Sequence, residues 1–149
     1  NHEKNTSRLL TINFYFIQCF LNSSDAEDCS TKKLQQMRPT YPLGIGSIEG
    51  YSIVSYDIIE NGDVNNIKVI DSQCVQFDEN EEIYFKKCPF FKNVSMGAAM
   101  YFKYTPPKDT NGNACLIKDK LHKYNFQRMR SFHEYIDSYD GPESIDTKK

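Results

Sequence analysis

Residues 51–59 constrain the fold of this chain most, because their side chains alternate in the pattern of an extended strand. Val54, Tyr56 and Ile58 share one face with Ser52, and the opposite face begins with Tyr51. Successive side chains of a strand point to opposite sides of the sheet, so this period of two separates two surfaces. The pattern therefore predicts a β-strand with one face well buried and the other partly buried.

A strong turn signal, Asn61-Gly62, follows this strand. Both residue types accept positive φ, which two-residue hairpin turns require. A second strand is expected over residues 64–71, with Ile67 and Val69 on one face. Because so short a connection joins neighbouring strands, the two strands should pair antiparallel.

Residues beyond this hairpin predict two helical stretches and a third strand. Asp78 and Glu81 have the spacing of a capping box, which predicts a helix over residues 78–87, ended by a proline. A second helical stretch is expected over residues 95–102, and a third strand over residues 118–127. The predicted fold class is α+β, with the order β-β-α-β. It consists of a small antiparallel three-stranded sheet packed by one or two helices.

The N-terminal residues resemble an export signal. Lys4 and Arg8 precede an apolar stretch over residues 9–21, and Ser24 and Ala26 follow it at a small-x-small spacing. This order is typical of a signal peptide, here cleaved near Ala26. The alternative is a buried or frayed N-terminal helix or strand.

The predicted organisation has four parts. Residues 1–26 form a signal peptide or short anchor, residues 27–37 a linker, residues 38–127 the folded domain and residues 128–149 a polar tail. The net charge of −2 leaves no excess of basic residues for a nucleic-acid partner. The export signal predicts that the chain is in the periplasm, either free or anchored in the inner membrane.

The cysteines agree with export. The sequence has five, and removal of a leader that contains Cys19 leaves four. Four cysteines allow three disulfide connectivities. Cys74 with Cys88 is the first choice because the two flank one short segment, which leaves Cys29 with Cys115. Four reduced, half-buried cysteines are the alternative.

Catalytic, metal-binding and cofactor-binding motifs receive no support from the sequence. His2, His122 and His133 have no histidine four residues away, and the chain lacks a Cys-x-x-Cys pair. The glycine-rich residues 44–50 precede a strand, whereas a phosphate-binding loop opens a helix. We therefore expect a binding protein without enzymatic activity, metal or cofactor.

Several short motifs then occur in a fixed order. They are Tyr41-Pro42, Ile48-Glu49-Gly50-Tyr51, Asn61-Gly62, the run over residues 64–72, and Phe102-Lys103-Tyr104-Thr105-Pro106-Pro107. Together they resemble the C-terminal domain of TonB-type energy transducers over residues 38–127. The resemblance implies that Tyr41, Pro42, Gly50, Asn61 and Gly62 are structural residues. Relative to that family, this chain has extra residues between positions 78 and 99.

The resemblance also implies a way of binding. Domains of this family accept an extended peptide of an outer-membrane receptor, which adds as a strand to the sheet edge and serves energised uptake with the proton-driven motor of the inner membrane. The edge here would be the third strand. The residues implied are Leu121, Lys123, Asn125 and Gln127 on that strand, and Gln35, Gln36 and Arg38 before the Tyr-Pro motif.

Other readings of the same residues stay open. Lys123 and Asn125 can be solvated polar positions that protect an edge strand from aggregation. An unpaired edge can also bind a second copy of the chain, which would give a homodimer. The alternative function is a freestanding exported adaptor or scaffold that keeps the fold without energy transduction.

Overall fold

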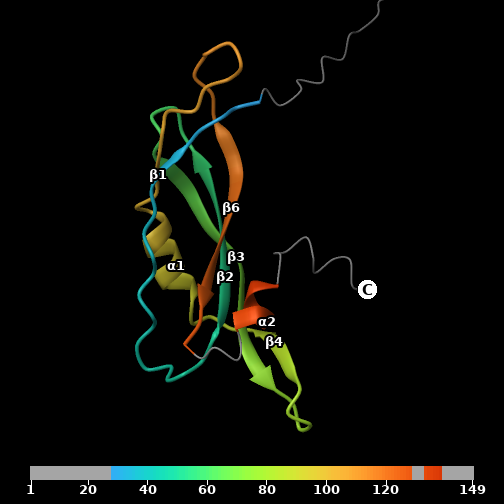
Figure 1. Ribbon diagram of the computed structural model, residues 1–149. Helices are drawn as coiled ribbons and strands as arrows, with labels where there is room; N and C mark the ends of the chain where they lie inside the picture. Colours follow the sequence, from blue (N-terminus) through green and yellow to red (C-terminus); the bar gives the residue numbers. More distant parts are fainter. Residues whose placement is uncertain (1–27, 129–132, 139–149) are drawn as a thin grey trace, which may run out of the picture.

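The computed structural model describes residues 28–128 and 133–138 (Figure 1). Its elements, in order, are β1 (Lys33–Gln35), β2 (Gly50–Ile58), β3 (Val64–Phe77), β4 (Ile83–Lys87), α1 (Lys92–Ala99), β5 (Lys103–Tyr104), β6 (Ile117–Phe126) and α2 (His133–Asp137). They form two antiparallel sheets, one with the strand order β4-β3-β2-β6 and one that pairs β1 with β5. The fold is mixed and mostly β, which agrees with the expected α+β class in its coarse form.

The main sheet has four strands where the sequence predicted three. The helix predicted over residues 78–87 is wrong, because Asp78 starts a turn instead. Its Oδ1 accepts the backbone N–H groups of Asn80 and Glu82, both at 2.8 Å, and Glu81 has a φ of 62°. β4 follows this turn, with Ile83 packed against the buried face of the sheet. Packing of Ile83 and Phe85 against this face therefore prevails over the local capping signal.

The β2–β3 hairpin is confirmed, with a different turn from the expected one. Gly62 has a φ of 88°, whereas Asn61 is not in the positive-φ region. The N–H of Gly62 donates to the carbonyl of Ile59, and the N–H of Ile59 donates to the carbonyl of Asp63, both at 2.9 Å. This is a longer loop, in which one residue near the left-handed region, here a glycine, closes the turn. β3 then runs on to Phe77, beyond the predicted end.

Each face of the sheet covers its own apolar cluster. The face toward α1 contains Val54, Tyr56 and Ile58, in agreement with the predicted alternation. The opposite face contains Tyr51 and Ile53, together with residues of β3, β4 and α2. In Figure 1, α1 and α2 lie on different sides of the sheet. β2 is therefore buried on both faces.

Helix α1 begins three residues earlier than expected, at Lys92. Its buried side chains are Ser95, Ala98 and Ala99. Met96 is 38% exposed, so the predicted helical spacing is present but the methionine does not face the core.

Both expected disulfides are confirmed. Cys74 bonds Cys88 across 14 residues and links β3 to the segment between β4 and α1. Cys29 bonds Cys115 across 86 residues and links the N-terminal arm to the loop before β6. Disulfides are typical of exported proteins, because reducing compartments keep thiols free.

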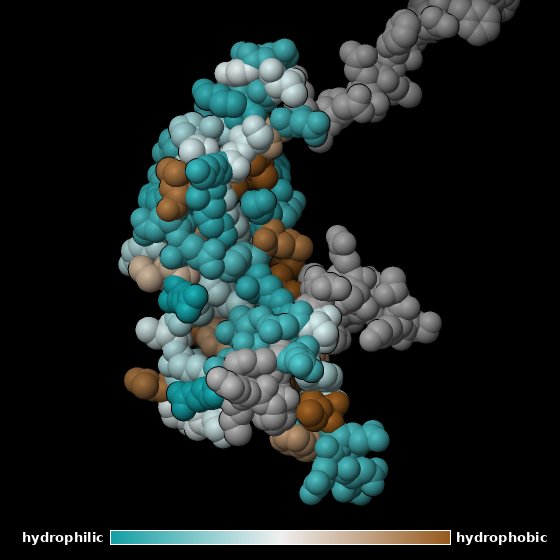
Figure 2. All heavy atoms as spheres, in the orientation of Figure 1, coloured by the Kyte–Doolittle hydropathy of each residue, from teal (hydrophilic) through white to brown (hydrophobic). Residues whose placement is uncertain are grey.

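Two elements lie outside the predicted domain core. β1 falls within the predicted linker, and α2 falls within the predicted polar tail. The leader predicted over residues 1–26 and the last ten residues of the tail lie outside the described residues. Figure 2 shows the tip of the β3–β4 hairpin, residues 78–82, as a hydrophilic projection at the lower end of the molecule.

Gly50 gives a direct test of the packing. A Cβ at this position would collide with the carbonyl oxygen of Gln73 and with the Phe91 ring, which lies 2.8 Å from the ideal Cβ. Gly50→Ala is therefore expected to lower the free energy of unfolding by about 2 kcal/mol, as overpacked cores do. Urea unfolding followed by circular dichroism measures the change.

Gly97→Ala is the matched control. A Cβ there meets nothing within 4 Å, and the residue lies inside α1. This variant should be unchanged or more stable by about 0.5 kcal/mol, because alanine favours helix. Equal destabilisation of both variants would contradict the packing that we assign to Gly50.

Candidate functional site

Strand β6 forms one edge of the main sheet. It pairs with β2 from Gly50↔Phe126 to Ile58↔Ile117, and the described residues place no strand on its other side. In an antiparallel strand, alternate residues direct their N–H and C=O groups to the same side, so an edge strand presents unpaired backbone groups. The predicted third strand, residues 118–127, is thus present one residue earlier as β6 (Ile117–Phe126).

A groove with a volume of about 380 Å³ runs beside β6. Its lining comes from the arm that follows β1 and from β6 with its following residue. It brings together five of the seven residues that the resemblance implied for partner binding: Gln36, Arg38, Lys123, Asn125 and Gln127. Gln35 and Leu121 do not line it. Gln35 pairs with Lys103 between β1 and β5, and Leu121 is 45% exposed on β6.

The arm is fixed over β6 by polar and aromatic contacts. Tyr124 donates its hydroxyl to the carbonyl of Met37 at 3.3 Å. The Tyr41 hydroxyl donates to the carbonyl of Ile48, and the Tyr41 ring lies edge-on to Phe126, with the ring centroids 5.9 Å apart. These contacts of Tyr41 hold one wall of the groove in place.

Helix α2 binds the side chains that β6 directs away from α1. Lys123 donates its ammonium to the carbonyl of Ile136. Asn125 and Gln127 both donate their side-chain amides to Asp137 Oδ1, at 2.7 and 3.0 Å. These three predicted binding residues already have partners within the chain. Sequence reasoning missed this because α2 lies in the segment taken as a polar tail.

Two arginines lie at or next to the groove: Arg38 lines it, and Arg128 contacts Tyr41, which also lines it. Arg38 is exposed, and no acidic side chain within residues 28–128 and 133–138 forms an ion pair with it. The guanidinium of Arg128 stacks on the Tyr41 ring at 4.0 Å. Burial raises the pKa of Tyr41, so this ring stays neutral near pH 7. An acidic group is thus the better electrostatic match for these two arginines.

His122 is enclosed by aromatic rings where the arm crosses β6. Its ring lies edge-on to Phe102 and Tyr124, with centroid separations of 5.1 and 4.6 Å. Burial lowers the pKa of His122 to about 4, and the Lys33 ammonium acts in the same direction. His122 is therefore a neutral packing residue near pH 7, and Gln36 Nε2 lies 3.5 Å from its Nε2.

No helix within residues 28–128 and 133–138 is long and apolar enough to cross a membrane. The same residues contain no group of three or more His, Cys, Asp or Glu side chains arranged to hold a metal ion.

No protein family matches this sequence, and no curated protein is significantly similar to it.

His122 should make the stability of the fold depend on pH in the acid range. The unfolded chain has a histidine pKa of about 6.5, so below that pH it binds a proton that the folded state excludes. Stability should therefore fall as the pH drops from about 6.5 to 4, by about 2 kcal/mol after allowance for the partial exposure of the ring. An NMR titration of the His122 ring should have its midpoint near pH 4.

His122→Phe is the control for this effect, because it keeps an aromatic ring against Phe102 without a titrating group. Its stability should depend less on pH between 6.5 and 4 than that of the parent chain. A His122 midpoint near pH 6.5 would show that the ring is open to water.

Proposed function

We propose that this chain is an exported binding module that takes up an extended peptide by strand addition along the free edge of β6. The observation that carries the proposal is the position of the groove. It lies beside an edge strand and contains five of the residues that the TonB-like motifs implied. Backbone hydrogen bonds to the edge would give affinity, and side chains at alternate positions would give selectivity.

The geometry supports an extended ligand over a compact one. β6 is 10 residues long, and the groove follows it from His122 to Gln127. A strand that pairs with β6 needs only the backbone groups of its edge, so α2 can keep its contacts to Lys123 and Asn125. Arg38 at the groove supports a peptide with an acidic side chain or a free carboxylate nearby.

The TonB-like motifs extend the proposal to a particular setting. The ligand would be the periplasmic segment of an outer-membrane receptor or of another envelope protein, and the chain would act without catalysis. Two disulfides support an oxidising compartment such as the periplasm. Energised uptake would require a further contact with a proton-driven motor in the inner membrane.

Peptide titration followed by NMR tests the mode of binding. The probes are synthetic peptides from the periplasmic segments of outer-membrane receptors, added to the disulfide-bonded chain. Amide shifts should concentrate on β6 and on Gln36 and Arg38. Arg38→Ala should weaken binding about fivefold, because it removes one charged contact at the groove.

Lys86→Ala is the matched control, since Lys86 lies on β4, the other edge strand. It should leave the affinity unchanged. Absence of binding at high micromolar peptide, or shifts that follow β4 instead, would contradict the proposal. Concentration-dependent shifts of β6 without peptide would show that a second copy of the chain occupies the edge.

A further inference from the structure

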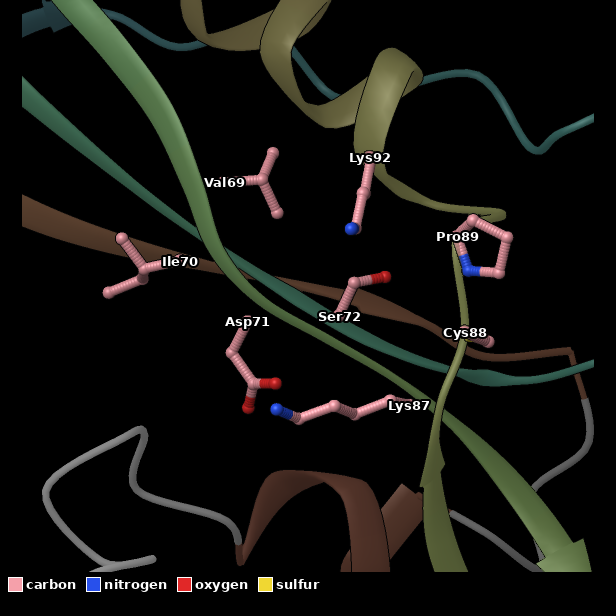
Figure 3. A pocket seen from close by; sticks show the side chains of 8 residues that line it. All are labelled: Val69, Ile70, Asp71, Ser72, Lys87, Cys88, Pro89 and Lys92. Atoms are coloured by element: carbon pink, nitrogen blue, oxygen red, sulfur yellow. The ribbon is translucent and has the colours of Figure 1, made fainter.

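A second pocket lies far from β6, in the notch where β4 stops covering β3. β4 pairs with β3 only over residues 73–77, so the earlier part of β3 has an open outer edge. The pocket there has a volume of about 290 Å³ (Figure 3). It is lined by Val69, Ile70, Asp71, Ser72, Lys87, Cys88, Pro89 and Lys92. Ile70 stands at the bulge between the Ile53 and Val54 pairs, where β3 bends beside the notch.

Ser72 is the unusual residue of this pocket. It is only 4% exposed, and its hydroxyl has no hydrogen-bond partner among the described residues. A buried polar group without a partner destabilises the fold, because it loses its hydrogen bonds to water. In Figure 3 the Ser72 side chain extends from β3 and that of Lys92 from α1 into the same space. The Ser72 hydroxyl therefore lies without a partner at the wall of this pocket.

The start of α1 adds positive potential. Helix N-termini leave backbone N–H groups without partners inside the helix. Phe91 occupies the N-cap position and supplies no side-chain hydrogen bond, and the first turn has no acidic residue. Lys92, the first residue of the helix, is exposed and lines the pocket, and so does the exposed Lys87. These groups favour a negatively charged occupant.

Among the described residues, Asp71 is the only acidic side chain that lines this pocket, and it already accepts two hydrogen bonds. Tyr51 donates its hydroxyl to Oδ2 at 2.6 Å, and Gln73 donates its amide to Oδ1 at 2.9 Å. These bonds hold the carboxylate on the face of Tyr51, away from α1. Ser72 and Lys92 thus define the anion-accepting side of the pocket, whereas Figure 3 shows the Lys87 ammonium beside the Asp71 carboxylate.

We propose that this notch binds a small oxyanion, a phosphate or a carboxylate group, between the Ser72 hydroxyl, the Lys92 ammonium and the start of α1. The ligand oxygen accepts from Ser72, and the charge is balanced by Lys92. The Cys74–Cys88 disulfide fixes the wall that contains Cys88 and Pro89. This site is independent of the β6 groove.

NMR titration of the oxidised chain tests the site, with sodium phosphate and sodium acetate as separate probes at constant ionic strength. Saturable shifts of Ser72, Lys92 and Asn93 are expected with at least one probe. The stronger probe tells whether the site prefers a phosphate or a carboxylate. Ser72→Ala and Lys92→Met should each weaken binding about tenfold, because each removes a group that would face the anion.

Lys68→Met is the control, since Lys68 is an exposed lysine of β3 outside the notch. It removes the same charge and should leave the affinity unchanged. Equal weakening by Lys68→Met and Lys92→Met would overturn the proposal in favour of general charge screening. Full affinity in Ser72→Ala, or no saturation up to about 50 mM of either anion, would overturn it as well.

Discussion

The rest of this structure depends on the burial of β2 on both of its faces. Tyr51 and Ile53 fill one cluster, Val54 and Tyr56 fill the other, and β3 and β6 pair on either side. Asp57, near the end of β2, also hydrogen-bonds to both neighbouring strands, β6 and β3. It accepts the backbone N–H of Asp119 at 2.9 Å and the side-chain amide of Asn66 at 3.2 Å. The Asp119 N–H is the main cause of the lowered pKa of Asp57.

A local sequence pattern predicted the fold correctly where tertiary packing favours the same secondary structure as the pattern. Alternation in residues 51–59 determined β2 correctly, since a strand that is flanked by two others must bury alternate side chains. The segment around Asp78 contained a capping box, which predicted a helix that did not form. The strand formed because Ile83 and Phe85 reach the cluster under α2. That cluster includes residues from distant segments, which a local pattern does not reveal.

The two candidate sites differ in the same way. β6 was expected as an edge strand from the order of motifs, and its groove gathers residues from both sides of the sequence. The contacts from Lys123 and Asn125 to α2 were not expected, because a short charged segment gives no sign of where it docks. The Ser72 notch had no sequence signal at all. A serine becomes informative only when its hydroxyl is found buried and without a partner.

The two proposed sites lie at opposite edges of the main sheet, so both can be occupied at the same time. The β6 groove lies at one edge of the main sheet, and the notch lies at the other, where β4 leaves β3. A peptide strand on β6 would extend the sheet without contact with α1 or the Cys74–Cys88 disulfide. Any energetic coupling would have to pass through β2, of which every residue except Asp57 is buried. Close packing resists small displacements, so binding at the two edges should be additive.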